Sequence, residues 1–137
     1  MSLSLPYAYI TARELATMIK ASPSAALKDY AVVDVRGDDF VGGNIVSALN
    51  YPSETFHDNV SGLVERLKTV PKVIFHCALS QARGPKAARI YAESRASLVP
   101  TAPPQQILVL RDGFSGFQAL YRHDPDLVEK FNKYYHD

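Results

Sequence analysis

Cysteine, tryptophan and long apolar runs are scarce or missing in this chain. Its 137 residues include one cysteine, Cys77, and no tryptophan. Because a single cysteine cannot form an internal disulfide, we expect a reducing compartment, the cytoplasm or also the nucleus. No apolar stretch approaches the roughly 20 residues that a membrane-spanning helix needs. The segment Met1–Pro6 is too short and too uncharged for a signal peptide.

Runs of like charge and clusters of metal ligands are missing as well. The 15 basic and 14 acidic residues give a net charge of +1 and are well mixed along the chain. This balance argues against a nucleic-acid-binding surface and against a polybasic membrane surface, so we predict neither kind of partner. Outside the central segment, the histidines His57, His123 and His136 lack the spacing of metal ligands, and we predict no metal site.

The chain does contain apolar strand patterns that alternate with helical ones. Apolar, β-branched runs at residues 31–35, 73–75 and 107–110 predict buried parallel strands. A single α/β domain over residues 1–137 follows, with a central parallel sheet and helices on both faces. We expect a break at Ser22-Pro23 and helices over residues 11–20, 53–68, 85–97, 114–121 and 125–134.

The segment from His76 to Pro85 carries the strongest chemical signal. Its pattern, His76-Cys77-x5-Arg83-Gly84-Pro85, joins a predicted strand to a predicted helix. A tight loop of this kind points successive backbone N–H groups into one concavity, which binds a tetrahedral oxyanion with help from the helix dipole. Cys77 lies in the same field, which favours the nucleophilic thiolate. Arg83 offers a planar fork that can hold two oxyanion oxygens.

This pattern assigns a role to each loop residue. We predict that the Cys77 thiolate attacks the oxyanion in line, while Arg83 and the loop amides stabilise the charge. The Ser80 hydroxyl is expected to donate a hydrogen bond to the cysteine sulfur. His76 is expected to tune the thiolate, or to pack beneath the loop with its ring nitrogens satisfied by backbone groups. The residues predicted to bind the oxyanion are Ala78, Leu79, Ser80, Gln81, Ala82 and Arg83.

Other polar residues follow neighbouring strands. In parallel sheets ligands bind at the carboxyl ends of the strands, so we expect residues 34–39, 77–83 and 111–112 to converge. Asp34, with Arg36, is expected to hydrogen-bond the backbone of nearby loops and so to have a structural or tuning role. Hydrolysis of an ester also needs a general acid for the leaving oxygen. Asp39 is our first candidate, ahead of Asp38 and Asp112.

These residues resemble a known family. The segment His76–Pro85 is similar to the active-site loop of the rhodanese-fold M-phase inducer phosphatases and of the related eukaryotic arsenate reductases. Val32–Arg36, followed by Gly42–Ile45 and Ala48–Pro52, resembles the rhodanese signature, although Asn44 replaces the usual histidine and is expected to alter a structural hydrogen bond. Leu108–Phe114 resembles the turn near the rhodanese C-terminus. The resemblance spans about residues 9–121 and implies a rhodanese-like fold.

The resemblance implies a cysteine-dependent phosphatase of the protein tyrosine or dual-specificity type. Such an enzyme works through a phosphocysteine intermediate and needs no cofactor. Its substrate would be a phosphate ester, including that of a phosphoprotein.

The alternative that the resemblance implies is an arsenate reductase. The M-phase inducer phosphatases carry loop glutamates where this chain has Ala78 and Ala82, and the arsenate reductases lack them. With no second cysteine, arsenate reduction would need an external thiol, glutathione with glutaredoxin. A sulfurtransferase is a weaker interpretation, because sulfurtransferases of this fold have a loop one residue shorter. A non-catalytic binding module would not need the intact Cys77 and Arg83.

Overall fold

The computed structural model describes residues 5–21 and 24–136. The predicted break at Ser22-Pro23 and most of the segment Met1–Pro6 lie outside these ranges. No helix within the ranges has the length and apolar character of a membrane span. The elements in chain order are β1 (Ala8–Ile10), α1 (Ala12–Lys20), β2 (Ala31–Asp34), β3 (Asn44–Ile45), β4 (Leu49–Asn50), α2 (Phe56–Leu67), β5 (Lys72–His76), α3 (Arg83–Leu98), β6 (Gln106–Leu110), α4 (Gly113–Tyr121) and β7 (Val128–Glu129), with 3-10 turns at Asp38–Phe40, Ser53–Thr55 and Lys133–Tyr135.

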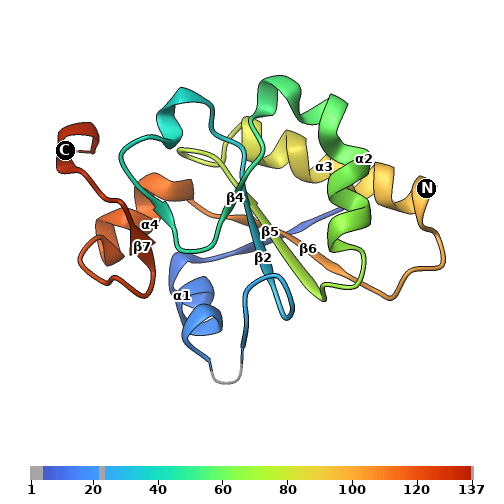
Figure 1. Ribbon diagram of the computed structural model, residues 1–137, viewed down its shortest axis with the longest axis horizontal. Helices are drawn as coiled ribbons and strands as arrows, with labels where there is room; N and C mark the ends of the chain where they lie inside the picture. The colour runs from blue at the N-terminus through green and yellow to red at the C-terminus, as the bar shows by residue number, and fades with distance from the viewer. Residues whose placement is uncertain (1–4, 22–23, 137) are drawn as a thin grey trace.

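The main sheet has five parallel strands in the order β1-β6-β5-β2-β4. The middle strand, β5, pairs with β2 through Phe75 opposite Val33 and with β6 through Phe75 opposite Val109. Figure 1 shows this sheet at the centre of the molecule. The predicted parallel sheet is confirmed, and the strand that leads into Cys77 is its central one.

Helices cover both faces of the sheet, as predicted. Successive residues of a strand point to opposite faces. Val33 and Phe75 belong to the core under α2 and α3, whereas Val32 and Ile74 belong to the core under α1 and α4. In Figure 1, α2 and α3 lie together on one side of the strands, with α1 and α4 on the other. The continuous apolar runs of β2 and β5 follow from this burial on both faces.

The helix starts follow local sequence signals. The Thr11 hydroxyl accepts a hydrogen bond from the Glu14 N–H, and the Glu14 carboxylate accepts one from the Thr11 N–H, so the predicted capping box opens α1. Helix α3 begins at Arg83, two residues before the predicted start at Pro85. Proline fits this first turn because its missing N–H would have no intrahelical acceptor there.

The predicted helix over residues 125–134 is wrong. Asp124 does start a single turn, since its carbonyl accepts hydrogen bonds from the N–H groups of Leu127 and Val128. The chain then leaves the turn as β7, which pairs antiparallel with β3. The Asn44 side chain donates to the Glu129 carboxylate across this pairing, at 2.8 Å. Strand pairing and burial of Leu127 and Val128 therefore outweigh a weak local helix signal.

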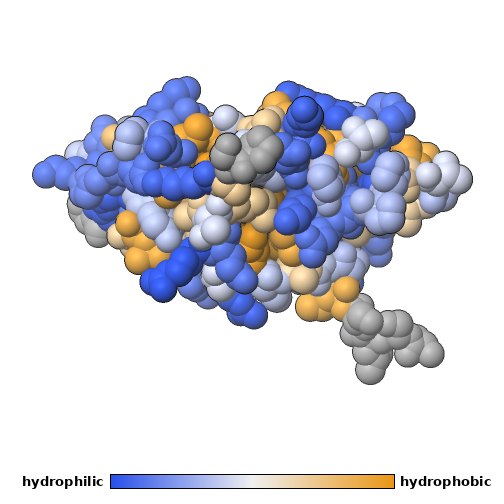
Figure 2. Space-filling model, turned by 90° about the horizontal axis from the view of Figure 1, so that it is seen from below, coloured by the Kyte–Doolittle hydropathy of each residue, from blue (hydrophilic) through white to orange (hydrophobic). Residues whose placement is uncertain are grey.

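The molecular surface is predominantly polar on the face that Figure 2 shows. Apolar side chains appear there in separate patches between hydrophilic ones. Scattered exposed apolar residues of this kind are ordinary for a folded protein.

Candidate active site

The Cys77 sulfur lies at the carboxyl end of the central strand, beneath the loop that leads into α3. Cys77 is almost fully buried. Two backbone N–H groups donate to its Sγ, from Ser80 at 3.2 Å and from Gly84 at 3.3 Å. The prediction that the Ser80 hydroxyl donates to the sulfur does not match this geometry, because the hydroxyl oxygen instead accepts from the Cys77 N–H at 3.4 Å. Ser80 reaches this position through a left-handed backbone, with φ of 55°.

The other N–H groups of the loop are free to bind a ligand. Among the described residues, none of these N–H groups donates to a protein acceptor. They stand at the N-terminus of the 16-residue helix α3, whose dipole favours negative charge. The arrangement suits a tetrahedral oxyanion above the cysteine sulfur. The residues with these free N–H groups are Ala78, Leu79, Gln81, Ala82 and Arg83.

The Arg83 guanidinium holds the carboxylate of Asp39. Nη1 donates to Oδ1 at 3.0 Å and Nη2 donates to Oδ2 at 2.8 Å, so the pair is bidentate. These hydrogen bonds hold the pKa of the Asp39 carboxyl below its usual value. Asp39 therefore lies at the site, as the convergence of strand ends predicts, but in this arrangement it is ionised and carries no proton. Asp38 is exposed and makes no described hydrogen bond to the loop.

A fully buried charge pair, Asp34 with Arg36, holds the turn that carries Asp39. The Asp34 carboxylate accepts hydrogen bonds from Arg36 Nε at 3.0 Å and Nη2 at 2.7 Å. The same guanidinium donates to the carbonyl oxygens of Asp39 at 2.9 Å and Gly43 at 2.8 Å. The pair thus fixes the backbone of the turn that carries Asp39.

His76 is buried between this pair and the loop. Its Nδ1 lies 3.0 Å from the Cys77 carbonyl oxygen, and because a carbonyl only accepts, Nδ1 carries the hydrogen. Its Nε2 lies 3.6 Å from Asp34 Oδ2, too far for a hydrogen bond. Burial lowers the pKa of His76, which the nearby Asp34 only partly offsets, so the ring is neutral near pH 7. The neutral ring holds the Cys77 backbone in place.

Gly113 is a site residue that sequence reasoning missed. The N–H groups of Phe114 and Ser115 donate to the carbonyl oxygens of Cys77 and Ala78, both at 2.9 Å. A Cβ on Gly113 would lie 2.5 Å from both of these oxygens. The turn after β6 therefore packs against the back of the loop, and only glycine fits there. The Asp-Gly pair at the end of a predicted strand was the available signal.

Comparison with known proteins places this chain in a family. No family model matches the chain. It is 32% identical over 120 residues to the dual specificity phosphatase Cdc25 of Arabidopsis thaliana, which covers 87% of this chain and 78% of that protein. It is 31% identical over 111 residues to arsenate reductase 2.2 of Oryza sativa subsp. japonica, covering 80% and 81% of the two chains. The chain belongs to the rhodanese-fold family of Cdc25-like phosphatases and arsenate reductases.

The solved structures agree with this family. Saccharomyces cerevisiae Ygr203w, described as a homologue of single-domain rhodanese and of the Cdc25 phosphatase catalytic domain, superposes with a TM-score of 0.77 at 28% identity. The match covers 96% of this chain and 93% of that one. The predicted rhodanese-like fold is confirmed. Members of the Cdc25-like and arsenate reductase family are cysteine-based enzymes, and this chain has one cysteine.

Two cavities of the molecule differ in chemistry, and one of them borders the loop. A cavity of about 340 Å³ beside the loop is lined by residues of β1, the loop and the end of β6. Arg111 lines it and stacks on Tyr9, with the guanidinium carbon 4.4 Å from the ring centroid. Leu79, also in its wall, is 53% exposed and gives the site a neutral rim. This family member therefore has the third predicted strand end, residues 111–112, at its site.

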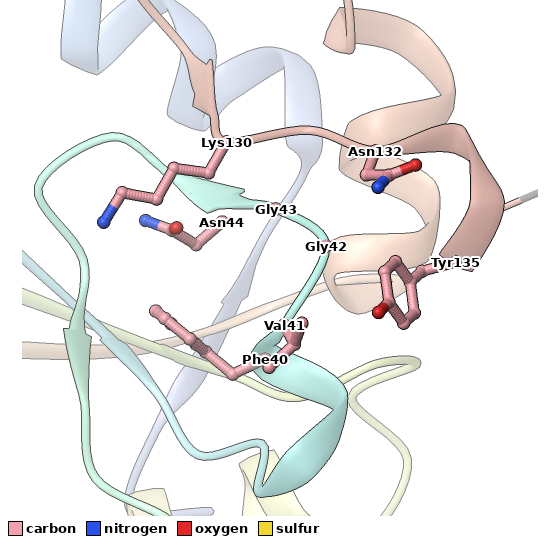
Figure 3. Close-up of a pocket in the computed structure, with 8 residues that line it drawn as sticks. All are labelled: Phe40, Val41, Gly42, Gly43, Asn44, Lys130, Asn132 and Tyr135. Atoms are coloured by element: carbon pink, nitrogen blue, oxygen red, sulfur yellow. The ribbon is translucent and has the colours of Figure 1, made fainter.

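The second cavity, of about 450 Å³, is lined by residues 40–44 and by residues of the C-terminal segment (Figure 3). Its lining includes Phe40, Lys130 and Tyr135 but neither a cysteine nor a carboxylate. Within residues 5–21 and 24–136, no three histidine, cysteine or carboxylate side chains gather as metal ligands. Among the described residues, the groups suited to act as a nucleophile and to bind an oxyanion therefore lie in the Cys77–Arg83 loop.

Proposed function

We propose that this chain hydrolyses aryl phosphate esters, including phosphotyrosine, through a covalent phosphocysteine at Cys77. The main support is the environment of the Cys77 sulfur. Two N–H groups donate to the sulfur, further loop N–H groups are free, and Arg83 stands at the end of the same loop. This combination binds a phosphoryl group and stabilises the charge that develops on it during transfer.

The proposed reaction has two displacement steps. In the first, the Cys77 thiolate attacks phosphorus, an S–P bond forms and the P–O bond to the leaving group breaks. The loop N–H groups and Arg83 bind the equatorial oxygens. In the second, water attacks phosphorus, the S–P bond breaks and the thiolate returns. An aryl leaving group fits a loop without an acid, because a phenolate needs less protonation than an alkoxide.

The proposal gives the surrounding residues supporting roles. His76 holds the Cys77 carbonyl, and Asp34 with Arg36 holds the turn of Asp39. Asp39 stays our candidate for the general acid, because it is the carboxylate in contact with Arg83. The substrate is the phosphate oxyanion of a small ester or of a phosphoprotein, and we infer that the enzyme acts in a reducing compartment.

Arsenate reduction is the second candidate. The loop has alanine at residues 78 and 82 and so offers no acid, and transfer of arsenate to a thiol releases no alkoxide. Two of the relatives are named arsenate reductases. Reduction of arsenate needs two electrons, and the single cysteine cannot supply both by forming an internal disulfide. An external thiol, glutathione with glutaredoxin, would provide them.

The test compares wild type with Cys77→Ser on an aryl phosphate between about pH 5 and pH 8, a range around the titration of an activated thiolate. We expect hydrolysis by wild type and none by the variant. If wild type is inactive although phosphate protects Cys77 from alkylation, arsenate reduction replaces the phosphatase proposal. Inactivity without protection would refute an oxyanion site at this loop.

A further inference from the structure

Arg83 is already engaged before any substrate binds. Both of its terminal nitrogens donate to the Asp39 carboxylate, at 3.0 and 2.8 Å. These bonds use the Nη1 and Nη2 edge of the guanidinium. A phosphoryl group above Cys77 that binds this same edge would compete with Asp39, because one edge cannot hold two anions at once.

We propose that a bound oxyanion takes Arg83 away from Asp39, and that the released Asp39 carboxyl then gives a proton to the leaving oxygen. This proposal rests on the phosphatase function proposed above. It makes Asp39 a catalytic acid that is available only once the substrate is in place.

The exposure of the pair makes this exchange inexpensive. The Arg83 and Asp39 side chains are 36% and 44% exposed. Ion pairs with this much solvent contact contribute little to stability. An oxyanion gains the fork of Arg83 and also the free N–H groups of the loop, which Asp39 does not reach in this structure.

The backbone of Asp39 stays in place while its side chain moves. Its carbonyl oxygen accepts from the buried Arg36, and the turn closes through Val41 N–H to the Asp38 carbonyl at 3.2 Å. The next residues are held from behind, since the Asn132 N–H donates to the Gly42 carbonyl at 2.8 Å. Figure 3 shows this stretch beside the C-terminal segment. Release from Arg83 is therefore a side-chain rotation that keeps Asp39 next to the loop.

The exchange also favours protonation of Asp39. Two cations act on its carboxyl, Arg83 from the start of α3 and Arg36 from the segment after β2. Asp38 is its exposed neighbour in the same turn. Hydrogen bonds from Arg83 are the main cause that lowers the pKa of Asp39. Loss of these bonds removes that cause, and a phosphate dianion nearby raises the pKa further. The proton enters from solvent or with a monoanionic ester.

The atoms and electrons balance over both steps. When the S–P bond forms, the electron pair of the breaking P–O bond goes to the leaving oxygen, which takes the proton of Asp39. In the second step the Asp39 carboxylate takes a proton from the attacking water. The electron pair of the S–P bond returns to the Cys77 sulfur as phosphate leaves. Asp39 ends the cycle protonated and loses its proton when it pairs with Arg83 again.

The first experiment measures the exchange without any hydrolysis. Inorganic phosphate is titrated against alkylation of Cys77 by iodoacetamide, and the protection curve gives the phosphate affinity. We expect Asp39→Asn to bind phosphate about fivefold more tightly than wild type, the factor that corresponds to about 1 kcal/mol for an exposed pair. Glu54→Gln is the control for loss of one negative charge, because exposed Glu54 lies beside Gly37 at the start of the same turn. Equal affinities for Asp39→Asn and Glu54→Gln would refute the exchange.

The second experiment measures the proton donation. We expect Asp39→Asn to lower kcat for phenyl phosphate by about 100-fold or more, the usual range of general acid catalysis. For 4-nitrophenyl phosphate, whose leaving group needs little protonation, we expect a loss below about tenfold. Equal losses on the two esters would refute the acid role, as would a selective loss in Asp38→Asn instead. If wild type hydrolyses neither ester, the phosphatase function and the proton donation fail together, and the phosphate affinities still decide the exchange.

Discussion

Two aspartate–arginine pairs meet at the turn of Asp39 in this protein and differ in burial. Asp34 and Arg36 are at most 1% exposed, whereas Asp39 and Arg83 are 44% and 36% exposed. Both pairs have short, bidentate geometry. A buried ion left without its partner is costly, but an exposed ion finds water. Burial therefore makes the first pair a fixed support and leaves the second free to exchange partners with a substrate.

The largest effect should come from breaking the buried pair. Arg36→Met leaves the Asp34 carboxylate buried without a cation, and we expect a loss of about 3–5 kcal/mol in the free energy of unfolding. Chemical denaturation measures it. Arg83→Met is the matched control and should cost less than about 1 kcal/mol. Similar losses in the two variants would contradict the contrast between the pairs.

The next largest effect should come from Gly113→Ala. The new Cβ would meet the carbonyl oxygens of Cys77 and Ala78 at 2.5 Å, so we expect a loss of about 1–3 kcal/mol from overpacking and a drop in activity. Gly62→Ala is the control, because apart from the adjoining backbone of helix α2 no atom lies within 4 Å of its Cβ position. In that variant the free energy of unfolding should rise by about 0.5–1 kcal/mol. Normal stability and activity in Gly113→Ala would show that the loop tolerates displacement.

A smaller, pH-dependent effect should come from His76. Burial lowers its pKa in the folded state, so below about pH 6.5, the ordinary value, the unfolded state binds more protons. The stability that the neutral ring provides is present above that pH and is lost as pH falls towards the folded pKa. His76 changes the free energy of unfolding by at most about 1.4 kcal/mol per pH unit.

Denaturation curves at about pH 7.5 and pH 5.5, on either side of the ordinary histidine pKa, test this expectation. His76→Gln should reduce the difference in the free energy of unfolding between the two pH values. Asp34 and Arg36, which face His76, stay unchanged in that variant. His57→Gln, at an exposed position of α2, should leave the difference as in wild type. An equal pH dependence in His76→Gln and wild type would mean that His76 is not the titrating group.

The smallest effect should be that of Asp39→Asn on stability. The exposed pair with Arg83 is screened by salt, so we expect a loss below about 1 kcal/mol at low salt and a smaller one at high salt. Denaturation at two salt concentrations measures it. A large, salt-independent loss would make Asp39 a structural residue and would exclude easy release from Arg83.

The sequence alone was enough to predict the α/β fold and the Cys77–Arg83 loop. Apolar runs bounded by turns predicted the strands beside Cys77, and the spacing of Cys77 and Arg83 predicted an anion-binding loop before α3. The C-terminal helix failed because β7 forms only through pairing with β3, which lies far away in the sequence. The Asp39–Arg83 pair was out of reach for the same reason, since the two residues are 44 positions apart. The hydroxyl of Ser80 was misplaced because its left-handed backbone turns the N–H to the sulfur.

The most direct test of the account is to trap the covalent intermediate. Wild type is mixed with an aryl phosphate, quenched in acid within one turnover and digested for mass spectrometry. The account predicts a phosphoryl group on Cys77, and a strongly reduced amount in Arg83→Met. Release of phenol without any phosphoryl group on Cys77 would contradict it, because hydrolysis would then proceed without the sulfur that the loop surrounds.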